Sequence, residues 1–319
     1  MGKDNKYRLS NKARENYKLT NWSSYNSSLK NRGDISLWFS EDVKTGWYHS
    51  GLQSPGGELV YSDSCIEFCL TIKYLFRLPY RQTEGFIRGL FNIARIDLKV
   101  PSYTQMQRRS KKLSINIRVR KKEKGPIDLV LDSTGLKVYG DGEWKVRKHG
   151  WNQRRTWRLM HMASDGSDLE IMAVSLTKND KSDSEAGIGL MGSLNCPINT
   201  VAADGAYDSK GFRGCLDPSI PQLIPPRHDA VDSGGKIPEY HQRDEAVKEI
   251  KQTGRKEWKK KIGYHIRSKS EVNMLRYKMA FGEKLTARIF EFEQSEIKIK
   301  CKILNQFVAF GMPKSYKAS

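Results

Sequence analysis

Two aspartates stand where apolar segments of the sequence end. Asp132 follows the run 127–131 and Asp204 follows the run 200–203, and both runs have the composition of short buried strands. Acidic side chains at the ends of neighbouring strands converge at one edge of an α/β sheet, where two of them can share a metal ion. Aspartate also commonly caps the turn after a strand, and for either residue alone that role is the more common one. A third group is needed to choose between these interpretations.

A polar stripe near the C-terminus supplies further candidates. Tyr264, Arg267, Glu271 and Lys278 are separated by 3, 4 and 7 positions. At about 100° per residue they fall within roughly a 60° arc of one helix. Such an arc could equally be the solvated face of an amphipathic helix, with Arg267 and Glu271 forming an ordinary pair one turn apart. Helical geometry by itself leaves both alternatives open.

The order and spacing of these groups resemble a known family. The pattern Tyr-x2-Arg-x3-Glu-x6-Lys, the segment 132–144 around the first aspartate and the segment 202–208 around the second are similar to signature blocks of bacterial insertion-sequence transposases. Those enzymes have an RNase-H-like catalytic domain with a DDE triad, and insertion sequence family five is the most similar group. The resemblance extends over residues 31–310.

The resemblance implies a role for each of these residues. Asp132, Asp204 and Glu271 would coordinate two Mg²⁺ ions, for which Mn²⁺ can substitute, because hard cations prefer carboxylate oxygens. Two such ions can activate a water, hold the scissile phosphate and stabilise the leaving 3′ oxygen, and the same site can then join that 3′ end to target DNA. Arg267 and Lys278 would hold phosphates nearby, and Tyr264 would pack or hydrogen-bond beside them.

The segments that must position these residues predict an α/β domain over residues 126–319. Four apolar runs predict its strands, at 127–131, 156–163, 169–176 and 200–203. A helix is expected over 184–194, and further helices follow later in the chain. Residues 217–254 begin rich in Pro and Gly and then become polar, and we interpret them as an insertion. This order is typical of a mixed sheet with flanking helices, the RNase-H-like fold that the resemblance implies.

The part of the chain before this domain is predicted to be basic and helical. Residues 1–30 are rich in Asn, Ser and Lys and are expected to form a polar tail. Beyond it, in the region 31–125, apolar spacing predicts helices over 63–78 and 80–93, and a third over 102–113 that begins with a serine cap. The last two have the shape of a helix-turn-helix unit, although a solvated helical hairpin would have the same pattern.

Basic and amide side chains in this region are the expected DNA contacts. Those on the third helix would reach base edges and phosphates in a major groove, and those after it would lie on the phosphate backbone. The candidates are Gln105, Arg108, Arg109, Lys111 and Lys112 on the helix, Lys121 and Lys122 after it, and Lys137 beyond the first strand.

The overall charge favours a polyanionic partner. The 319 residues contain 56 Lys and Arg against 36 Asp and Glu, which leaves a formal net charge of +20. The longest uncharged stretch, 186–203, contains Ser, Asn and Pro, so we expect no membrane-spanning helix. The polar start lacks the apolar core of a secretory signal. We therefore expect a bacterial cytoplasmic protein that associates with the nucleoid when bound to DNA.

The expected partner is double-stranded DNA, both at the ends of the element and at its target. Two ends must be brought together, so a homodimer on DNA is expected. Two alternatives remain open from the sequence. A Mg²⁺-dependent nuclease would cut DNA and never join strands, and a DNA-binding protein that had lost its chemistry would do neither, although the complete triad argues against the second.

Overall fold

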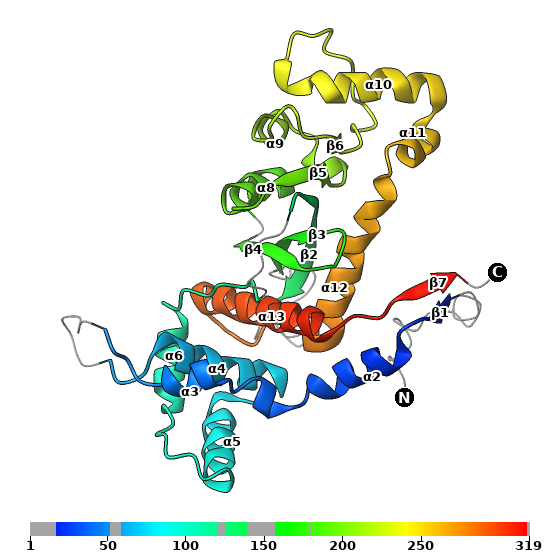
Figure 1. The fold of residues 1–319 in the computed structure, drawn as a ribbon. Helices are drawn as coiled ribbons and strands as arrows, with labels where there is room; N and C mark the ends of the chain where they lie inside the picture. Colours follow the sequence, from blue (N-terminus) through cyan, green and yellow to red (C-terminus); the bar gives the residue numbers. More distant parts are fainter. Residues whose placement is uncertain (1–16, 52–58, 120–124, 139–156, 179, 318–319) are drawn as a thin grey trace, which may run out of the picture.

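The fold combines a central mixed sheet, helices on both of its faces and a helical N-terminal region (Figure 1). The computed structural model describes residues 17–51, 59–119, 125–138, 157–178 and 180–317. The helices are α2 (Trp22–Asn31), α3 (Glu41–Thr45), α4 (Asp63–Leu75), α5 (Tyr80–Ile93), α6 (Tyr103–Ser110), α8 (Asp183–Gly192), α9 (Lys210–Gly214), α10 (His241–Thr253), α11 (Arg255–Lys261), α12 (Ser268–Phe281) and α13 (Phe290–Phe310). Short 3-10 helices are η1 (Ile35–Leu37), η2 (Gly205–Tyr207), η3 (Pro238–Tyr240) and η4 (Tyr264–Arg267). Within the described ranges, every helix is too short or too polar to cross a bilayer.

Five strands form the sheet in the order β4-β3-β2-β5-β6. Their bounds are β2 (Ile127–Lys137), β3 (Trp157–Asp165), β4 (Ile171–Lys178), β5 (Ile198–Ala202) and β6 (Gln222–Leu223). β2, β3 and β4 pair antiparallel, whereas β5 runs parallel to β2 and β6 runs parallel to β5. This mixed sheet with its flanking helices confirms the predicted α/β class and the RNase-H-like architecture.

Alternation along β2 divides the two faces of the sheet. Leu129 and Leu131 pack with α8 and α9 on one face. Leu136 packs with α12 and α13 on the other face, where Val130 contacts Ile266 of η4. Because successive side chains of a strand point to opposite faces, Asp132 shares the face of Val130 and points toward η4 and α12.

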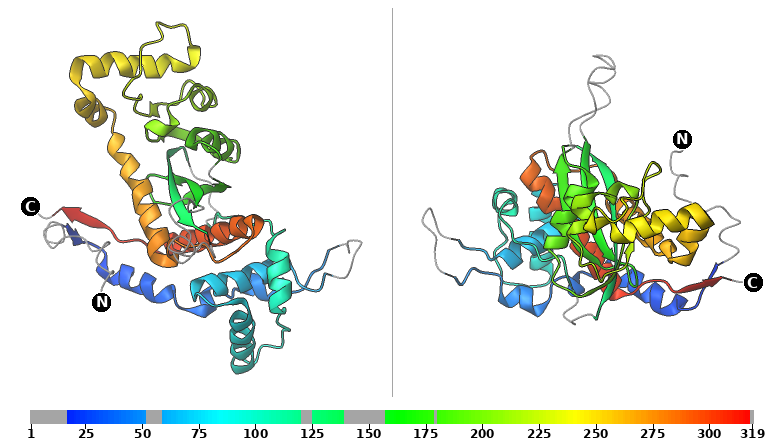
Figure 2. Two further views of the ribbon diagram at one scale, coloured as in Figure 1. Left: turned by 180° about the vertical axis from the view of Figure 1, so that it is seen from behind. Right: turned by 90° about the horizontal axis from the view of Figure 1, so that it is seen from above.

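Helix α13 is buried on two sides and joins the N-terminal helices to the sheet (Figure 2). Ile299 and Ile303 belong to the core that α4, α5 and α6 form, whereas Ile297 and Leu304 belong to the core beneath the sheet. These positions alternate around the helix at helical spacing, so opposite sides of α13 enter different cores. The N-terminal helices therefore pack onto the sheet domain through α13.

The segment expected to be an insertion contributes a strand to the sheet. Residues 222–223 form β6, which pairs with Val201 and Ala202 of β5. A two-residue strand in a stretch rich in proline has no alternation that periodicity could detect. The segment interpreted as an insertion therefore includes β6 of the sheet, while α10 at the end of that range lies away from the sheet (Figure 1).

The first 30 residues are not all tail. β1 (Tyr17–Leu19) pairs antiparallel with β7 (Ser315–Lys317) near the other end of the chain, and α2 follows it. The Asn21 side chain bonds the carbonyl of Met312 at 3.0 Å and the amide of Lys314 at 2.7 Å. Partners almost 300 positions away satisfy these polar groups, which is why local composition did not reveal them. Residues 1–16 lie outside the described ranges.

The predicted helices of the N-terminal region are present, with shorter ends. Ser102 caps α6 through a capping box, as expected, but α6 ends at Ser110 and α4 ends at Leu75. Residues 94–102 connect α5 to α6, a longer link than the turn of about 3–4 residues in a helix-turn-helix unit. The two helices still pack against each other through the core that contains Ile87 and Met106.

A buried ion-pair network attaches the edge strand and α10 to the rest of the domain. Asp208 accepts hydrogen bonds from Arg213 Nε at 2.8 Å, from the Arg227 amide at 2.9 Å and from Arg243 Nε at 3.3 Å. Arg213 also donates to Gln222 of β6 at 2.9 Å. The side chains of Asp208 and Arg213 are each 1% exposed, so the Arg213 guanidinium would lack a counter-charge without Asp208.

We expect Asp208→Asn to lower the free energy of unfolding by about 3–5 kcal/mol, because it leaves the buried Arg213 guanidinium without its counter-charge, whereas Arg243 keeps Asp244 at 3.5 Å. Urea denaturation followed by circular dichroism measures this loss. The exposed Asp229 is the matched control, and Asp229→Asn should stay within about 0.5 kcal/mol of the wild type. Equal stabilities of the two variants would contradict a structural role for the network.

Candidate active site

Asp132 and Asp204 lie at the same level of the sheet. The parallel pairing of β2 with β5 ends at Val130 and Ala202, and each aspartate is two residues further along. β2 itself continues to Lys137 because its hairpin pairing with β3 extends that far. The expectation that Asp132 ends its strand is therefore wrong, but the end of the β5 pairing still brings the two aspartates together.

Asp132 is the more enclosed of the two aspartates. Its carboxylate accepts hydrogen bonds from Ser270 Oγ at 3.0 Å and from the Ser133 amide at 2.9 Å. Burial raises the pKa of Asp132, and the neighbouring Arg267 and these two hydrogen bonds oppose the increase. Asp204 has a second role, because it caps η2 by accepting a hydrogen bond from the Ala206 amide at 2.9 Å. Asp204 therefore caps a turn, as the alternative interpretation expects, but only through Oδ1. Its Oδ2 faces Arg267 and could also bind a cation.

One guanidinium contacts all three candidate carboxylates. Arg267 Nη1 lies 2.7 Å from Glu271 Oε1, while Nη2 lies 3.4 Å from Asp132 Oδ1 and 3.7 Å from Asp204 Oδ2. The one-turn pair of Arg267 with Glu271 exists, as the solvated-face alternative requires, but the same guanidinium also faces the two aspartates. The exposed fraction rises from 13% for the Asp132 side chain to 39% for Asp204 and 63% for Glu271. The cluster therefore opens to solvent on the Glu271 side.

The backbone before α12 delivers Arg267 to this position. Gly263 has φ of +70°, a left-handed conformation that favours glycine, and it turns the chain from α11 into η4. Gly166, in the turn between β3 and β4, lies under η4, and a Cβ there would stand 2.8 Å from Ile266. The predicted single helix from Tyr264 to Lys278 is thus a 3-10 turn followed by α12.

Tyr264 lies beside the carboxylates and Lys278 lies apart from them. Burial raises the pKa of Tyr264 to about 12, with the three nearby carboxylates adding to the increase and Arg267 opposing it. Its ring is 4.8 Å from the Lys259 ammonium. Lys278 Nζ instead lies 4.0 Å from Glu283, whose other oxygen is 3.9 Å from Lys137 Nζ. The polar stripe therefore divides between two clusters.

The acidic cluster has the donor chemistry of a divalent-cation site. Three carboxylates supply only oxygen, the donor that Mg²⁺ prefers, and all three already face one positive charge. Among the described residues, no group of three His, Cys, Asp or Glu side chains is close enough together to bind a metal ion with the side chains in their present positions. Arg267 lies among the carboxylates where a metal would need room, so its guanidinium and a cation would compete for the same oxygens.

The expected DNA-contacting side chains have different surroundings. Gln105 is engaged in the capping box of Ser102. Arg109 donates to the Tyr61 carbonyl at 2.8 Å and pairs with Asp63 at the start of α4. Lys111 lies 4.0 Å from Glu291, whereas Arg108 on α6 and Lys112 in the turn after it are exposed. Lys121 and Lys122 lie outside the described residues.

Ser270 is a site residue that sequence reasoning missed. It is buried, and its hydroxyl donates to Asp132 while also contacting the Arg267 carbonyl at 2.7 Å. It precedes Glu271 directly, so it belongs to the same turn of helix. A lone serine in a polar helix carries no signal by itself, and only the docking of α12 on β2 shows its partner.

An RNase-H-like sheet with acidic residues at the end of its parallel strand pair defines a class of metal-dependent nucleases and strand transferases. Comparison with family models agrees with this class. Residues 123–306, more than half of the chain, match a transposase DDE domain, and residues 30–141 match a second model with the same description. No solved structure matches the chain. The chain belongs to the DDE transposase family, and it is therefore a metal-dependent enzyme that acts on DNA.

We expect Arg267→Ala to lower the free energy of unfolding by about 1–3 kcal/mol in EDTA, because three carboxylates lose their shared counter-charge. Added Mg²⁺ should then raise the melting temperature of the variant more than that of the wild type, since the guanidinium no longer competes for the same oxygens. Differential scanning calorimetry with and without Mg²⁺ measures both effects. Arg267→Lys keeps the charge, so its stability and its Mg²⁺-dependent shift in melting temperature should lie between those of the wild type and Arg267→Ala. An identical Mg²⁺ shift in all three proteins would contradict the competition.

Proposed function

We propose that this transposase binds the terminal inverted repeats of an insertion sequence and performs strand cleavage and strand transfer at Asp132, Asp204 and Glu271. The observation that supports this most directly is the convergence of the three carboxylates on one guanidinium. Groups far apart in the sequence meet there, in the order and spacing of insertion sequence family five. We assign the element to that family.

Asp132, Asp204 and Glu271 are the residues that would hold two Mg²⁺ ions, with Mn²⁺ as a substitute. When bound, such ions supply an activated water and stabilise the leaving 3′ oxygen. The residues of the chain have separate tasks. Ser270 keeps Asp132 oriented through its hydrogen bond. The Arg267 guanidinium, once released from the carboxylates, can donate two parallel hydrogen bonds to a phosphate. Tyr264 supports that guanidinium from the same turn.

Lys137 and Lys278 form a second phosphate-binding position in this proposal. Both ammonium groups lie near the carboxylate of Glu283 at the end of β2. The distances of 3.9 and 4.0 Å are long for an ion pair. Both cations would therefore be able to turn toward a DNA phosphate at this end of the strand.

We assign recognition of the element ends to the N-terminal helices. Arg108 on α6 and Lys112 just after it are exposed, and the basic segment with Lys121 and Lys122 follows. Phosphate contacts by lysine would supply affinity, and an arginine at a base edge would supply specificity. Because two ends must be joined to one target, we propose a homodimer on DNA that works in the bacterial cytoplasm at the nucleoid.

We expect Asp132→Asn, Asp204→Asn and Glu271→Gln each to slow strand cleavage at least about a thousandfold, because losing a metal ligand removes several kcal/mol of transition-state stabilisation. Binding of the element end should change less than about threefold, since no contact of the basic helices is removed. Single-turnover cleavage of a labelled end and a gel-shift assay measure the two quantities, with the exposed Glu257→Gln as control.

Near wild-type cleavage in any of the three variants would remove that residue from the site. A pre-cut end that carries a free 3′-OH distinguishes the nuclease alternative. Strand transfer of this end into target DNA is expected of a transposase, whereas cleavage without any transfer would favour a nuclease.

We expect Arg108→Ala to weaken specific end binding by about 1–3 kcal/mol and to relax sequence preference, because the exposed Arg108 makes only a long hydrogen bond of 3.4 Å, to the Thr104 carbonyl, and its terminal nitrogens would reach a base edge. Arg109→Ala should act differently and lower the melting temperature, since it removes the link to Tyr61 and Asp63. Replacing Lys121 or Lys122 should weaken binding to all DNA sequences about equally. It should also reduce the slope of log affinity against log salt concentration by about one. Competition binding at several salt concentrations measures these effects. Unchanged preference in Arg108→Ala would contradict base reading by α6.

A further inference from the structure

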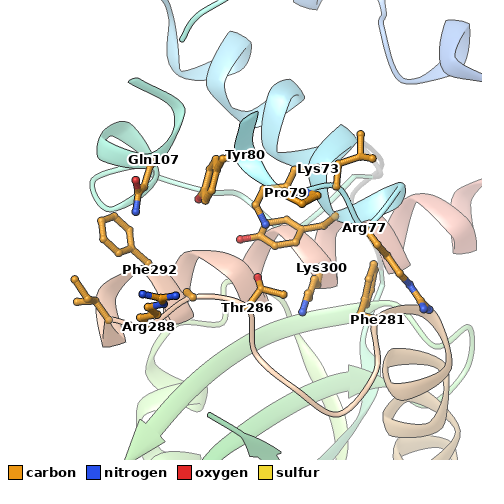
Figure 3. A pocket seen from close by; sticks show the side chains of 14 residues that line it. Lys73, Arg77, Pro79, Tyr80, Gln107, Phe281, Thr286, Arg288, Phe292 and Lys300 are labelled. Atoms are coloured by element: carbon orange, nitrogen blue, oxygen red, sulfur yellow. The ribbon is translucent and has the colours of Figure 1, made fainter. Parts of the chain in front are cut away.

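A cavity of about 620 Å³ lies between the N-terminal helices and the catalytic domain (Figure 3). Lys73 and Tyr80, from α4 and α5, line one side of it, and Phe281, Thr286 and Lys300, from the end of α12 to α13, line the other. The volume falls within the range of sites for small organic ligands. The cavity shares no residue with the carboxylate cluster.

Lys73 is the residue that makes this cavity unusual. It is 5% exposed, yet no carboxylate or hydrogen-bond acceptor among the described residues contacts its ammonium. Its nearest partners are the rings of Tyr74, at 4.1 Å from the centroid, and Tyr80, at 4.7 Å. Burial lowers the pKa of Lys73 to about 8, with Lys300 adding to the decrease and Glu296 opposing it. A buried ammonium without a counter-ion is costly unless a ligand supplies one.

The nearest carboxylate is fully engaged elsewhere. Glu296 accepts hydrogen bonds from Lys300 Nζ at 2.5 Å, from the amide of Thr286 at 2.9 Å and from that of Ala287 at 2.8 Å. Glu296 therefore stabilises the loop before α13, and its carboxylate oxygens are hydrogen-bonded to groups other than Lys73. The lining contains four basic side chains, those of Lys73, Arg77, Arg288 and Lys300, and no acidic one. Lys300 is already paired with Glu296 and Arg77 bonds backbone carbonyls, so the Lys73 ammonium is the charge that favours a negatively charged ligand here.

Aromatic side chains also line the cavity. Tyr80, Phe281 and Phe292 present rings to the cavity. The Arg77 guanidinium donates to the carbonyl of Ala280 at 2.7 Å, at the C-terminal end of α12, so the two sides of the cavity are held together. Aromatic rings beside a cluster of cations suit a planar base joined to a phosphate.

We propose that this cavity is a nucleotide-binding site, in which the Lys73 ammonium holds the phosphate and the aromatic wall contacts the base. The same chemistry has two sources, a free mononucleotide or a nucleotide turned out of a DNA strand. The neighbouring Gln107, from α6 of the DNA-binding region, also lines the cavity. The site stands independently of the carboxylate chemistry, since it uses none of those residues.

Lys73→Met tests the proposal, because it keeps the length of the side chain and removes the charge. With dAMP as the probe in isothermal titration calorimetry of the full chain, the variant should bind at least about tenfold more weakly than the wild type, as expected when a charged hydrogen bond is lost. Without ligand its melting temperature should stay close to that of the wild type, because the variant loses the contacts with the Tyr74 and Tyr80 rings but no longer buries a charge without a counter-ion. Lys256→Met, at an exposed lysine of α11, should match the wild type in both.

A second variant keeps the test decisive if Lys73→Met folds poorly. Phe292→Leu, at the partly exposed rim, should weaken dAMP binding and leave binding of inorganic phosphate unchanged. Asp132→Asn should bind dAMP like the wild type, so that loss of catalysis and loss of this site are separate results. Inorganic phosphate that binds as tightly as dAMP would overturn the base contact.

Two further probes distinguish the sources. A single-stranded oligonucleotide that binds the wild type more tightly than dAMP, and loses that advantage in Lys73→Met, supports a nucleotide of a DNA strand. Tight dAMP binding with no difference between the wild type and Lys73→Met in binding the oligonucleotide supports a free nucleotide. If the titrations with dAMP and with the oligonucleotide are each identical for the wild type and Lys73→Met, neither ligand contacts Lys73. This result would overturn the proposal.

Discussion

Three carboxylates held within reach of one another repel, and the guanidinium of Arg267 offsets that repulsion in this protein. Its two terminal nitrogens face Asp132, Asp204 and Glu271, which come from β2, the end of β5 and α12. Arginine suits this task because its charge is permanent and spread over a planar fork. The strand pairing, the 3-10 turn and the close approach at Gly166 all serve to keep these four groups together.

Helix α13 joins the N-terminal helices to the sheet domain. Its residues enter the core of the N-terminal helices on one side and the core beneath the sheet on the other. Arg77 adds a polar link, because it bonds the last carbonyls of α12, the helix that carries Glu271 near its start. The region to which we assign DNA recognition and the helix that completes the acidic cluster are therefore joined through side chains at fixed distances.

Asp208 and Ser270 show that residues adjacent in sequence to the acidic cluster have different tasks. Asp208 lies within the signature block of the second aspartate, yet its buried partners are Arg213 and Arg243, so it secures β6 and α10. Ser270 is next to Glu271 and instead contacts Asp132. Position in the sequence near a site residue therefore does not show what a residue does. The direction of its side chain decides which partners it contacts.

The sequence by itself determined the local elements and the chemical types of the site. Apolar spacing predicted α5 at its observed bounds, Ser102 marked the start of α6, and the spacing from Tyr264 to Lys278 placed Arg267 one turn from Glu271. These features depend on neighbours within a few residues. Tertiary structure alone decided that β2 continues beyond Asp132, that β6 joins the sheet and that residues 17–19 pair with the C-terminal strand. It also decided that one guanidinium meets all three acids, because contacts between distant segments depend on how the elements pack and leave no periodic trace in the sequence.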